Sequence, residues 1–202
     1  AKAHNAYIMV DEAHSLGVFG DKGRGLAEHE GVERDVDFIL GTFSKSVGTI
    51  GGFCVSNHDR MELLRVTARS YMFTASAPPA VIAGAAQTLA RIERDVQLRE
   101  KLWRNADHLY DGLKQIGMDV GPDKTPVIGV MMPDLEGGLR TWRALIENGV
   151  YVNLALPPAT PSGTCLLRCS VSAAHTPEQL DEVLATFEAV GSQSGVLANA
   201  AE

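Results

Sequence analysis

The chain has 202 residues, 45% of them hydrophobic, which is enough for one large globular domain or two small ones. It carries 25 acidic and 18 basic side chains, for a net charge of −7. Because the basic residues are also scattered, this balance argues against a nucleic-acid-binding surface. We find neither a signal peptide nor an apolar run of about 18 residues, so the sequence predicts no membrane span.

The three cysteines indicate the redox environment in which the chain works. Cys54, Cys165 and Cys169 are odd in number, include no C-x-x-C pair and lie among apolar or small neighbours. This pattern predicts buried, reduced thiols in a cytoplasmic protein and disfavours a metal site, so no metal is expected.

Short apolar runs alternate with glycine-rich turns in the first part of the chain, as in an α/β sheet covered on both faces. The expected strands are residues 6–10, 37–42 and 51–56. The first is expected to be buried and to end just before Asp11. A domain seldom opens on a central strand, and residue 1 is Ala rather than Met. We therefore expect the chain to be the carboxyl part of a longer polypeptide.

The second part of the chain begins with helical patterns. Pro78 and Pro79 mark the entrance of a helix, and a following amphipathic helix is expected to join two domains. From about Thr125 the sequence predicts a smaller α+β unit whose last helix is capped by Thr176 and Gln179. Its other elements are strands at residues 126–132, 150–153 and 165–171 and a helix at 139–149. The expected domains are residues 1–95 and 96–202.

Residues 11–14 spell D-E-A-H, a quartet that also occurs in nucleic-acid helicases, where the acids hold magnesium beside a nucleotide. Such a hydrolase needs G-x-x-x-x-G-K-[ST] upstream, because the backbone amides and the lysine of that loop bind the phosphates. The nearest candidate, G-T-F-S-K-S at 41–46, has the wrong spacing and lies downstream of the acids. The sequence therefore disfavours a helicase.

Asp11 and Lys45 each follow an expected strand. Ligand sites of open α/β sheets gather outside the carboxyl ends of the strands, so both side chains could face one crevice. A lysine and a carboxylate suit pyridoxal phosphate, because its aldehyde forms a Schiff base with an amine and its pyridine nitrogen is held protonated by an anion. The hydroxyls of Thr42 and Ser44 and the glycines after Lys45 suit its phosphate.

Each of these residues also has an ordinary structural explanation. Asp11 could cap the turn after its strand, Lys45 could be a solvated surface amine, and His14 could be a structural histidine. A strand-ending Asp, a His three residues later and a T-x-S-K loop after a second strand are hard to explain separately. Their combination favours the cofactor site.

Four segments, residues 11–25, 41–57, 73–79 and 157–176, resemble consecutive sequence blocks of the α-oxoamine synthases, which are pyridoxal-phosphate enzymes of fold type I. The resemblance covers nearly the whole chain and begins part-way through the family's large domain. It implies part of a large, doubly wound sheet domain followed by a carboxyl-terminal α+β small domain.

The resemblance also implies roles for individual residues. Lys45 would hold the cofactor as a Schiff base and move protons at the substrate α-carbon. Asp11 would pair with the pyridinium nitrogen, His14 would hydrogen-bond the ring hydroxyl, and Ala13 would pack beneath the ring.

Four further residues match the family pattern. Thr42 and Ser44 would serve the hydroxyl and phosphate region of the cofactor. Thr74 matches a threonine that reaches the cofactor phosphate of a partner subunit, which implies a homodimer with shared active sites. Arg168 matches the arginine that binds the substrate carboxylate through its planar fork of donors.

Within the family, the blocks are most similar to the bacterial members that condense L-serine with palmitoyl-CoA. The implied reaction is a decarboxylative condensation that yields 3-ketodihydrosphingosine, the first step of sphingolipid synthesis. A lipid product is compatible with peripheral contact with the inner membrane. The chain departs from these members at Leu156, where an arginine is expected. A sister enzyme that uses glycine or alanine, and a truncated, catalytically silent chain, remain alternatives.

Overall fold

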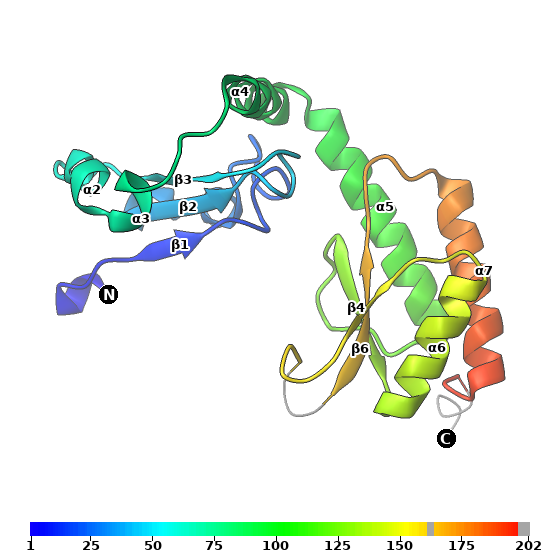
Figure 1. The fold of residues 1–202 in the computed structure, drawn as a ribbon. Coiled ribbons are helices and arrows are strands. Elements are labelled where there is room, and N and C mark those ends of the chain that lie inside the picture. The colour runs from blue at the N-terminus through cyan, green and yellow to red at the C-terminus, as the bar shows by residue number, and fades with distance from the viewer. Residues whose placement is uncertain (161–163, 198–202) are drawn as a thin grey trace. The chain divides into compact units, whose positions relative to one another are not determined.

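The computed structural model describes residues 1–160 and 164–197 and divides the chain into two compact units, unit 1 (residues 1–99) and unit 2 (residues 100–202) (Figure 1). The sequence had suggested a division after residue 95. Within the described ranges, no helix combines the length and the apolar character that a membrane crossing requires.

Unit 1 is built on a three-stranded sheet in the order β1-β2-β3. Strand β1 (Met9–Asp11) runs parallel to β2 (Phe38–Thr42), and β3 (Gly52–Val55) is antiparallel to β2. The helical elements of the unit are η1 (Lys2–His4), α1 (Leu26–His29), η2 (Glu33–Asp35), α2 (Met61–Thr67), α3 (Arg69–Met72) and α4 (Pro79–Arg94).

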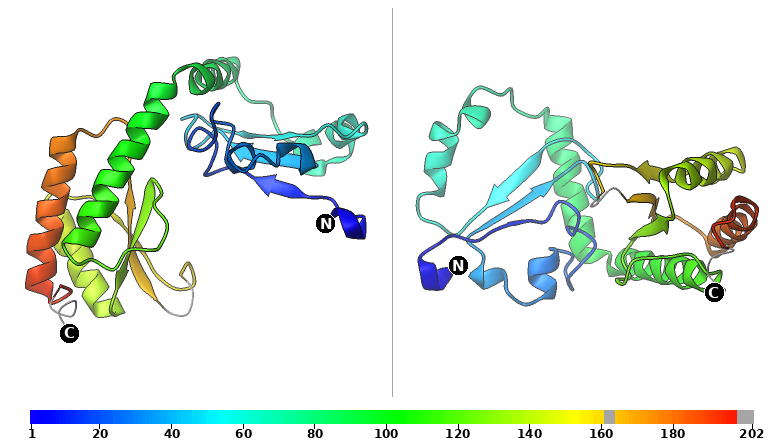
Figure 2. Two further views of the ribbon diagram at one scale, coloured as in Figure 1. Left: turned by 180° about the vertical axis from the view of Figure 1, so that it is seen from behind. Right: turned by 90° about the horizontal axis from the view of Figure 1, so that it is seen from below.

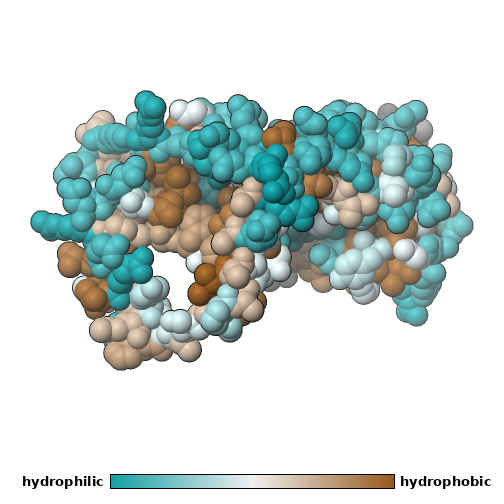
Figure 3. All heavy atoms as spheres, turned by 90° about the horizontal axis from the view of Figure 1, so that it is seen from above, coloured by the Kyte–Doolittle hydropathy of each residue, from teal (hydrophilic) through white to brown (hydrophobic). Residues whose placement is uncertain are grey.

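The first strand differs from its prediction in position and in burial. It covers residues 9–11 instead of 6–10, and Asp11 is its last residue rather than the residue after it. Tyr7 and Met9 were expected to be buried but are 68% and 62% exposed. Strand β1 lies at the edge of this sheet, and burial alternates along it: Tyr7, Met9 and Asp11 are exposed while Ile8 and Val10 are half-buried, so one face of this segment is open to solvent. Figure 3 shows hydrophobic side chains at the molecular surface among hydrophilic ones.

Helices α4 and α5 (Val96–Gln115) are separated at Asp95, whose backbone leaves the helical conformation. The Asp95 carboxylate accepts hydrogen bonds from Nε of Arg94 at 2.6 Å and Nε of Arg91 at 3.0 Å. These bonds lower the pKa of Asp95 to about 2. The break is therefore held by an ionised carboxylate at ordinary pH.

Unit 2 has a second sheet in the order β4-β6-β5, with both pairings antiparallel. Its strands are β4 (Val127–Met132), β5 (Asn153–Ala155) and β6 (Cys165–Ser170). Its helices are α5 from residue 100 onward, α6 (Leu135–Glu147) and α7 (Pro177–Ser194) (Figure 2). Alternate residues of β4 and β6 are buried, and they form one apolar cluster with Leu113, Leu145 and Phe187. One face of this sheet thus carries the core.

Two predicted elements of unit 2 were wrong in their bounds. Helix α6 begins four residues before the expected Leu139, because Asp134 caps it by accepting a hydrogen bond from the Gly137 amide at 2.7 Å. Gly138 in its first turn lies so close to β6 that a Cβ there would come within 2.4 Å of Cys165 Sγ. Strand β5 begins at Asn153 rather than at residue 150, since only there does pairing with β6 start. The predicted capping box of α7 is confirmed.

Candidate active site

The carboxyl ends of β1 and β2 lie at the same edge of the first sheet because the two strands are parallel. Asp11 pairs in register with Leu40, and the Glu12 amide extends the ladder by donating to the Leu40 carbonyl at 2.8 Å. Thr42 ends β2 two residues later. The turn that follows Asp11 and the loop that carries Lys45 therefore leave the sheet at one edge, and the crevice expected between their side chains stays a prediction.

Asp11, Ala13 and His14 form the first part of this edge. The Asp11 carboxylate is exposed and accepts a hydrogen bond from the Ala13 amide at 2.9 Å. It makes no ion pair with any side chain of the described ranges. Ala13 is half-buried and His14 is exposed. Asp11 thus caps its turn, and its carboxylate still faces solvent at the end of a strand.

The loop from Thr42 to Gly51 forms the second part of the edge. Thr42 Oγ1 lies 2.8 Å from Ser44 Oγ and 3.2 Å from the Ser44 amide nitrogen, and it also donates to the Gly51 carbonyl at 3.2 Å. Gly48 and Gly51 have φ angles of +71° and +102°, which only glycine adopts readily. The loop is tightly folded, and the ammonium of Lys45 is exposed on it.

An apolar hollow of about 280 Å³ adjoins this loop. Phe43, Ile50, Gly51 and Gly52 line it together with one face of α4. The α4 residues are Val81, Ile82, Ala85, Ala86 and Leu89, with Ala77 just before the helix. Such a lining offers few donors, so a phosphate group would instead find its donors at the hydroxyls and amides of the Thr42 loop.

Thr74 and Arg168 were predicted to act at the same site, but they lie on other parts of the chain. Thr74 is exposed just beyond α3, and its hydroxyl donates to the Ser70 carbonyl. Arg168 lies in unit 2 on β6, the central strand of its sheet, where it pairs in register with Gly129 and Asn153. Its Nε atom is buried and has no hydrogen-bond partner among the described residues.

Leu156 follows β5 and packs against the apolar cluster of unit 2. The position where the family resemblance led us to expect an arginine is thus occupied by a side chain that contributes to the core. Its backbone carbonyl accepts a hydrogen bond from the Ala159 amide at 2.8 Å.

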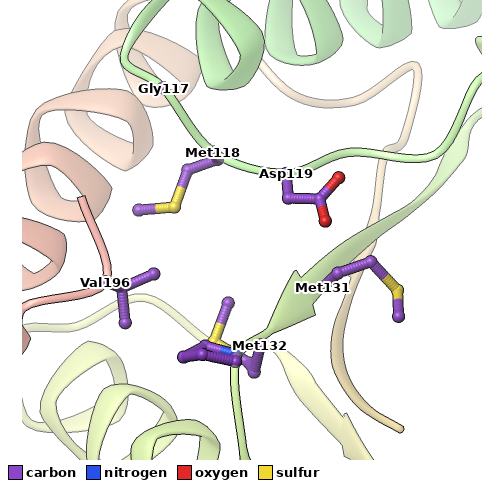
Figure 4. Close-up of a pocket in the computed structure, with 7 residues that line it drawn as sticks. Gly117, Met118, Asp119, Met131, Met132 and Val196 are labelled. Atoms are coloured by element: carbon purple, nitrogen blue, oxygen red, sulfur yellow. The ribbon is translucent and has the colours of Figure 1, made fainter. Parts of the chain in front are cut away.

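A second hollow, of about 330 Å³, lies in unit 2 (Figure 4). Met118, Met132 and Val196 lie around it, with Asp119 at its rim. It contains none of the predicted site residues. In the part of the chain that the structure describes, no group of three His, Cys, Asp or Glu side chains is arranged to hold a metal ion.

Glu12 is a residue whose contribution the sequence did not reveal. It is only 1% exposed, although it stands between the exposed Asp11 and the half-buried Ala13. Its carboxylate accepts hydrogen bonds from the Leu26 and Ala27 amides at 2.7 and 2.8 Å. The sequence did contain a signal for this burial. Side chains alternate between the two faces of a strand, so the residue after the exposed Asp11 is expected to point inward.

The chain matches the family model for aminotransferase class I and II over residues 1–187. It is 56% identical over 95% of its length to a serine palmitoyltransferase of Caulobacter vibrioides, and 36% identical over 98% to an 8-amino-7-oxononanoate synthase of Alkaliphilus oremlandii. It spans about half the length of these relatives, 47% and 50% respectively.

A solved structure described as serine palmitoyltransferase with pyridoxal phosphate superposes with a TM-score of 0.94 at 49% identity, covering 97% of this chain and 50% of that one. The predicted fold, part of a fold type I large domain followed by a carboxyl-terminal small domain, is thereby confirmed. With the family model matched over most of its residues, the chain belongs to the aminotransferase class I and II family.

Proposed function

We propose that this chain is the lysine-bearing part of an α-oxoamine synthase that condenses L-serine with a long-chain acyl-CoA, releasing coenzyme A and carbon dioxide and forming 3-ketodihydrosphingosine. In this proposal the enzyme is a cytoplasmic homodimer that contacts the membrane only peripherally. Residues 1–95 contribute to the cofactor-binding large domain, and residues 96–202 form the connecting helix and the small domain.

One observation carries the proposal: an exposed carboxylate, Asp11, at the end of β1 and an exposed amine, Lys45, just after the parallel strand β2 lie at one edge of the first sheet. The hydroxyl pair of Thr42 and Ser44 lies on the same loop as the amine. This set of groups fits pyridoxal phosphate, which needs an amine for its aldehyde, an anion for its ring nitrogen and donors for its phosphate.

When bound, pyridoxal phosphate supplies an electron-accepting ring that stabilises negative charge at the substrate α-carbon. Lys45 Nζ would hold the cofactor and, once the amine of serine has replaced it there, accept and return the α-proton. Asp11 would accept a hydrogen bond from the ring N–H and keep that nitrogen protonated. Ala13 and His14 would fix the ring from one face and at its hydroxyl group.

Arg168 would bind the substrate carboxylate. A buried guanidinium nitrogen without a partner is costly, and its Nε is in that condition here. A carboxylate that arrives with the substrate would satisfy it with charge-assisted hydrogen bonds. This assignment gives a role to the arginine that stands among Cys165, Leu166, Leu167 and Cys169 in β6.

Thr74 would donate to the cofactor phosphate of a partner subunit, so that each active site draws on two chains. In support of this role, its segment is exposed, and Phe73 beside it is 80% exposed. A second copy of the chain could bury this exposed segment in a dimer interface.

A sister activity, with glycine or alanine and another acyl-CoA, is the second candidate. Two observations favour it: the similarity to an 8-amino-7-oxononanoate synthase and the presence of Leu156 where serine-specific members are expected to have an arginine. A chain that lacks activity by itself is the third candidate, because the chain spans about half the length of its relatives.

The proposal is tested by titrating the purified protein with pyridoxal phosphate, recording visible absorbance, reducing with borohydride and mapping the labelled peptide by mass. We expect the cofactor on Lys45 and a spectral change with L-serine that glycine and alanine do not reproduce. Lys45→Ala should abolish the label. Lys22→Ala, which removes an exposed lysine of the same unit, should keep it.

The outcomes separate the three candidates. A spectral change with glycine or alanine alone would select the sister activity. A folded protein that binds no cofactor would select the silent chain, and a label on a lysine other than Lys45 would refute the site assignment.

A further inference from the structure

We propose that Glu12 is a positioning residue, which fixes Asp11 and His14 in the orientation that the cofactor requires. This inference rests on the proposed function, because it gives Glu12 a role at the same site. Glu12 itself touches neither cofactor nor substrate in this proposal. It acts through its neighbours in the chain.

The Glu12 side chain is a buried carboxylate that accepts three hydrogen bonds. The Leu26 and Ala27 amides donate to its two oxygens at 2.7 and 2.8 Å, and the Ser15 hydroxyl donates to the oxygen that Leu26 also contacts. These two amides begin the short helix α1, where backbone N–H groups lack partners within the helix. The carboxylate thus joins the end of β1 to a segment 14 residues further along the chain.

Gly25 provides the space for this carboxylate. Its φ angle is +124°, which favours glycine, and a Cβ at this position would lie 2.3 Å from Glu12 Oε2. The backbone therefore approaches the carboxylate more closely than any other residue type at position 25 would allow. Glu12 and Gly25 together close the loop that follows Asp11.

The backbone of Glu12 is fixed as firmly as its side chain. Its amide donates to the Leu40 carbonyl of β2, and its carbonyl accepts from the Ser15 and Leu16 amides at 3.1 and 2.9 Å. A residue held by backbone and side chain leaves its neighbours little rotational freedom. Asp11 on one side and the turn to His14 on the other are thereby directed outward at the sheet edge.

The competing explanation is that Glu12 only stabilises the loop. Glu28 provides a matched comparison, because its carboxylate also accepts backbone hydrogen bonds within this loop, from the Arg24 and Lys22 amides at 2.8 and 3.3 Å. Glu28 lies in α1, away from Asp11 in sequence. A role limited to loop stability predicts similar consequences for the two residues, whereas a positioning role predicts consequences for cofactor binding at Glu12 alone.

The experiment compares Glu12→Gln with Glu28→Gln. Each change keeps the size of the side chain and replaces one acceptor oxygen by an NH₂ group, so both variants should fold. Two quantities are measured: the dissociation constant of pyridoxal phosphate by absorbance titration, and amide hydrogen exchange of the cofactor-free protein by NMR. Exchange at Ser15 and Leu16 reports the turn beside Asp11, and exchange at Arg24 reports the loop near Glu28.

For Glu12→Gln we expect about tenfold weaker cofactor binding, the size of losing one charge-assisted hydrogen bond, and faster exchange at Ser15 and Leu16. For Glu28→Gln we expect faster exchange at Arg24 and unchanged cofactor binding. Equal cofactor affinity in Glu12→Gln and the unchanged protein would overturn the positioning role, and so would equal losses in both variants.

Failure of the inference can be told apart from failure of the proposed function. If the unchanged protein carries the cofactor on Lys45 and Glu12→Gln binds it equally well, only the inference is refuted. If the unchanged protein binds no cofactor, the proposed function fails for this chain. In that case exchange at Ser15 and Leu16 still tests the positioning role, because unchanged protection there in Glu12→Gln would refute it.

Discussion

In unit 2 the buried side chains of β4, β6, α5, α6 and α7 form one apolar cluster, whereas the buried cluster of unit 1 consists of Leu16, Val47 and Ala85 among its described residues. The sheet of unit 1 is half-buried at most of its positions. The edge that carries Asp11 and Lys45 therefore belongs to the unit with the smaller core.

The two units differ in the interactions that stabilise them. In unit 2, an extended apolar cluster packs the elements together, and buried polar groups such as Asn105, which donates to the Ser172 and His175 carbonyls, add to it. In unit 1, polar side chains bound to the backbone hold the segments near the candidate site. Glu12 does so at α1, and the buried Arg99 donates to the carbonyls of Ile92 and Asp21.

The largest difference between the units is expected in thiol reactivity. Burial raises the pKa of Cys169 in unit 2 to about 12, so at about pH 8 only about one molecule in ten thousand carries the reactive thiolate. Burial also raises the pKa of Cys165. Cys54 on β3 is only half-buried. Iodoacetamide followed by mass mapping should label Cys54 first, and the other two cysteines only after unit 2 unfolds. Equal labelling of all three would contradict the difference in burial.

Matched leucine truncations test the cores directly. Leu167→Ala in unit 2 should lower the free energy of unfolding by about 4 kcal/mol, because Leu167 is fully buried in a dense cluster. Leu16→Ala in unit 1 should cost about 2 kcal/mol, since its small cluster can collapse around the gap.

Urea unfolding with two probes separates the effects of these truncations. Both tryptophans, Trp103 and Trp142, lie in unit 2, so their fluorescence reports that unit, while circular dichroism reports both units. Leu16→Ala should leave the fluorescence transition in place. If both variants lost the same free energy of unfolding, the expected difference in stability between the cores of the two units would be refuted.

The smallest stability changes are expected at two glycines that lie in helices. A Cβ at Gly112 in α5 would lie 2.3 Å from a Leu184 methyl group of α7, whereas a Cβ at Gly84 in α4 would meet nothing within 4 Å. Gly112→Ala should therefore destabilise unit 2 by about 1–3 kcal/mol through overpacking. Gly84→Ala should stabilise α4 by up to about 1 kcal/mol, because alanine is the better helix former. Thermal melts monitored by circular dichroism measure both, and a destabilising Gly84→Ala would show that α4 packs more tightly than described.

The sequence predicted the elements whose signals are local. The Thr176 capping box, the helix entrance at Pro79 and the strands that became β2, β3, β4 and β6 were anticipated, because caps and apolar runs are encoded by adjacent residues. The short helices α1, α2 and α3 were not predicted, because a helix of one or two turns is too short to show a repeating pattern of apolar residues.

What the sequence could not supply was tertiary context. The predicted helix began only at residue 139, after Gly137 and Gly138, because the close approach of Cys165 that favours glycine at position 138 is a tertiary contact. The edge position of β1 depends on which strands pair with it. That Asp11 and Lys45 could share one side of the sheet was predicted from their places at the carboxyl ends of two expected strands, whereas their roles stay predictions until the labelling experiment is done.

The close approach of Gly25 to the Glu12 carboxylate also has a consequence for how this chain can evolve. A Cβ at position 25 would collide with that carboxylate, and the backbone there is strained for any residue other than glycine. A side chain at position 25 would meet two obstacles, the Glu12 carboxylate and the positive φ angle of the backbone, and loss of Glu12 would remove only the first. Position 25 is therefore expected to stay glycine even in a chain that has lost Glu12, which lies 13 positions earlier in the sequence.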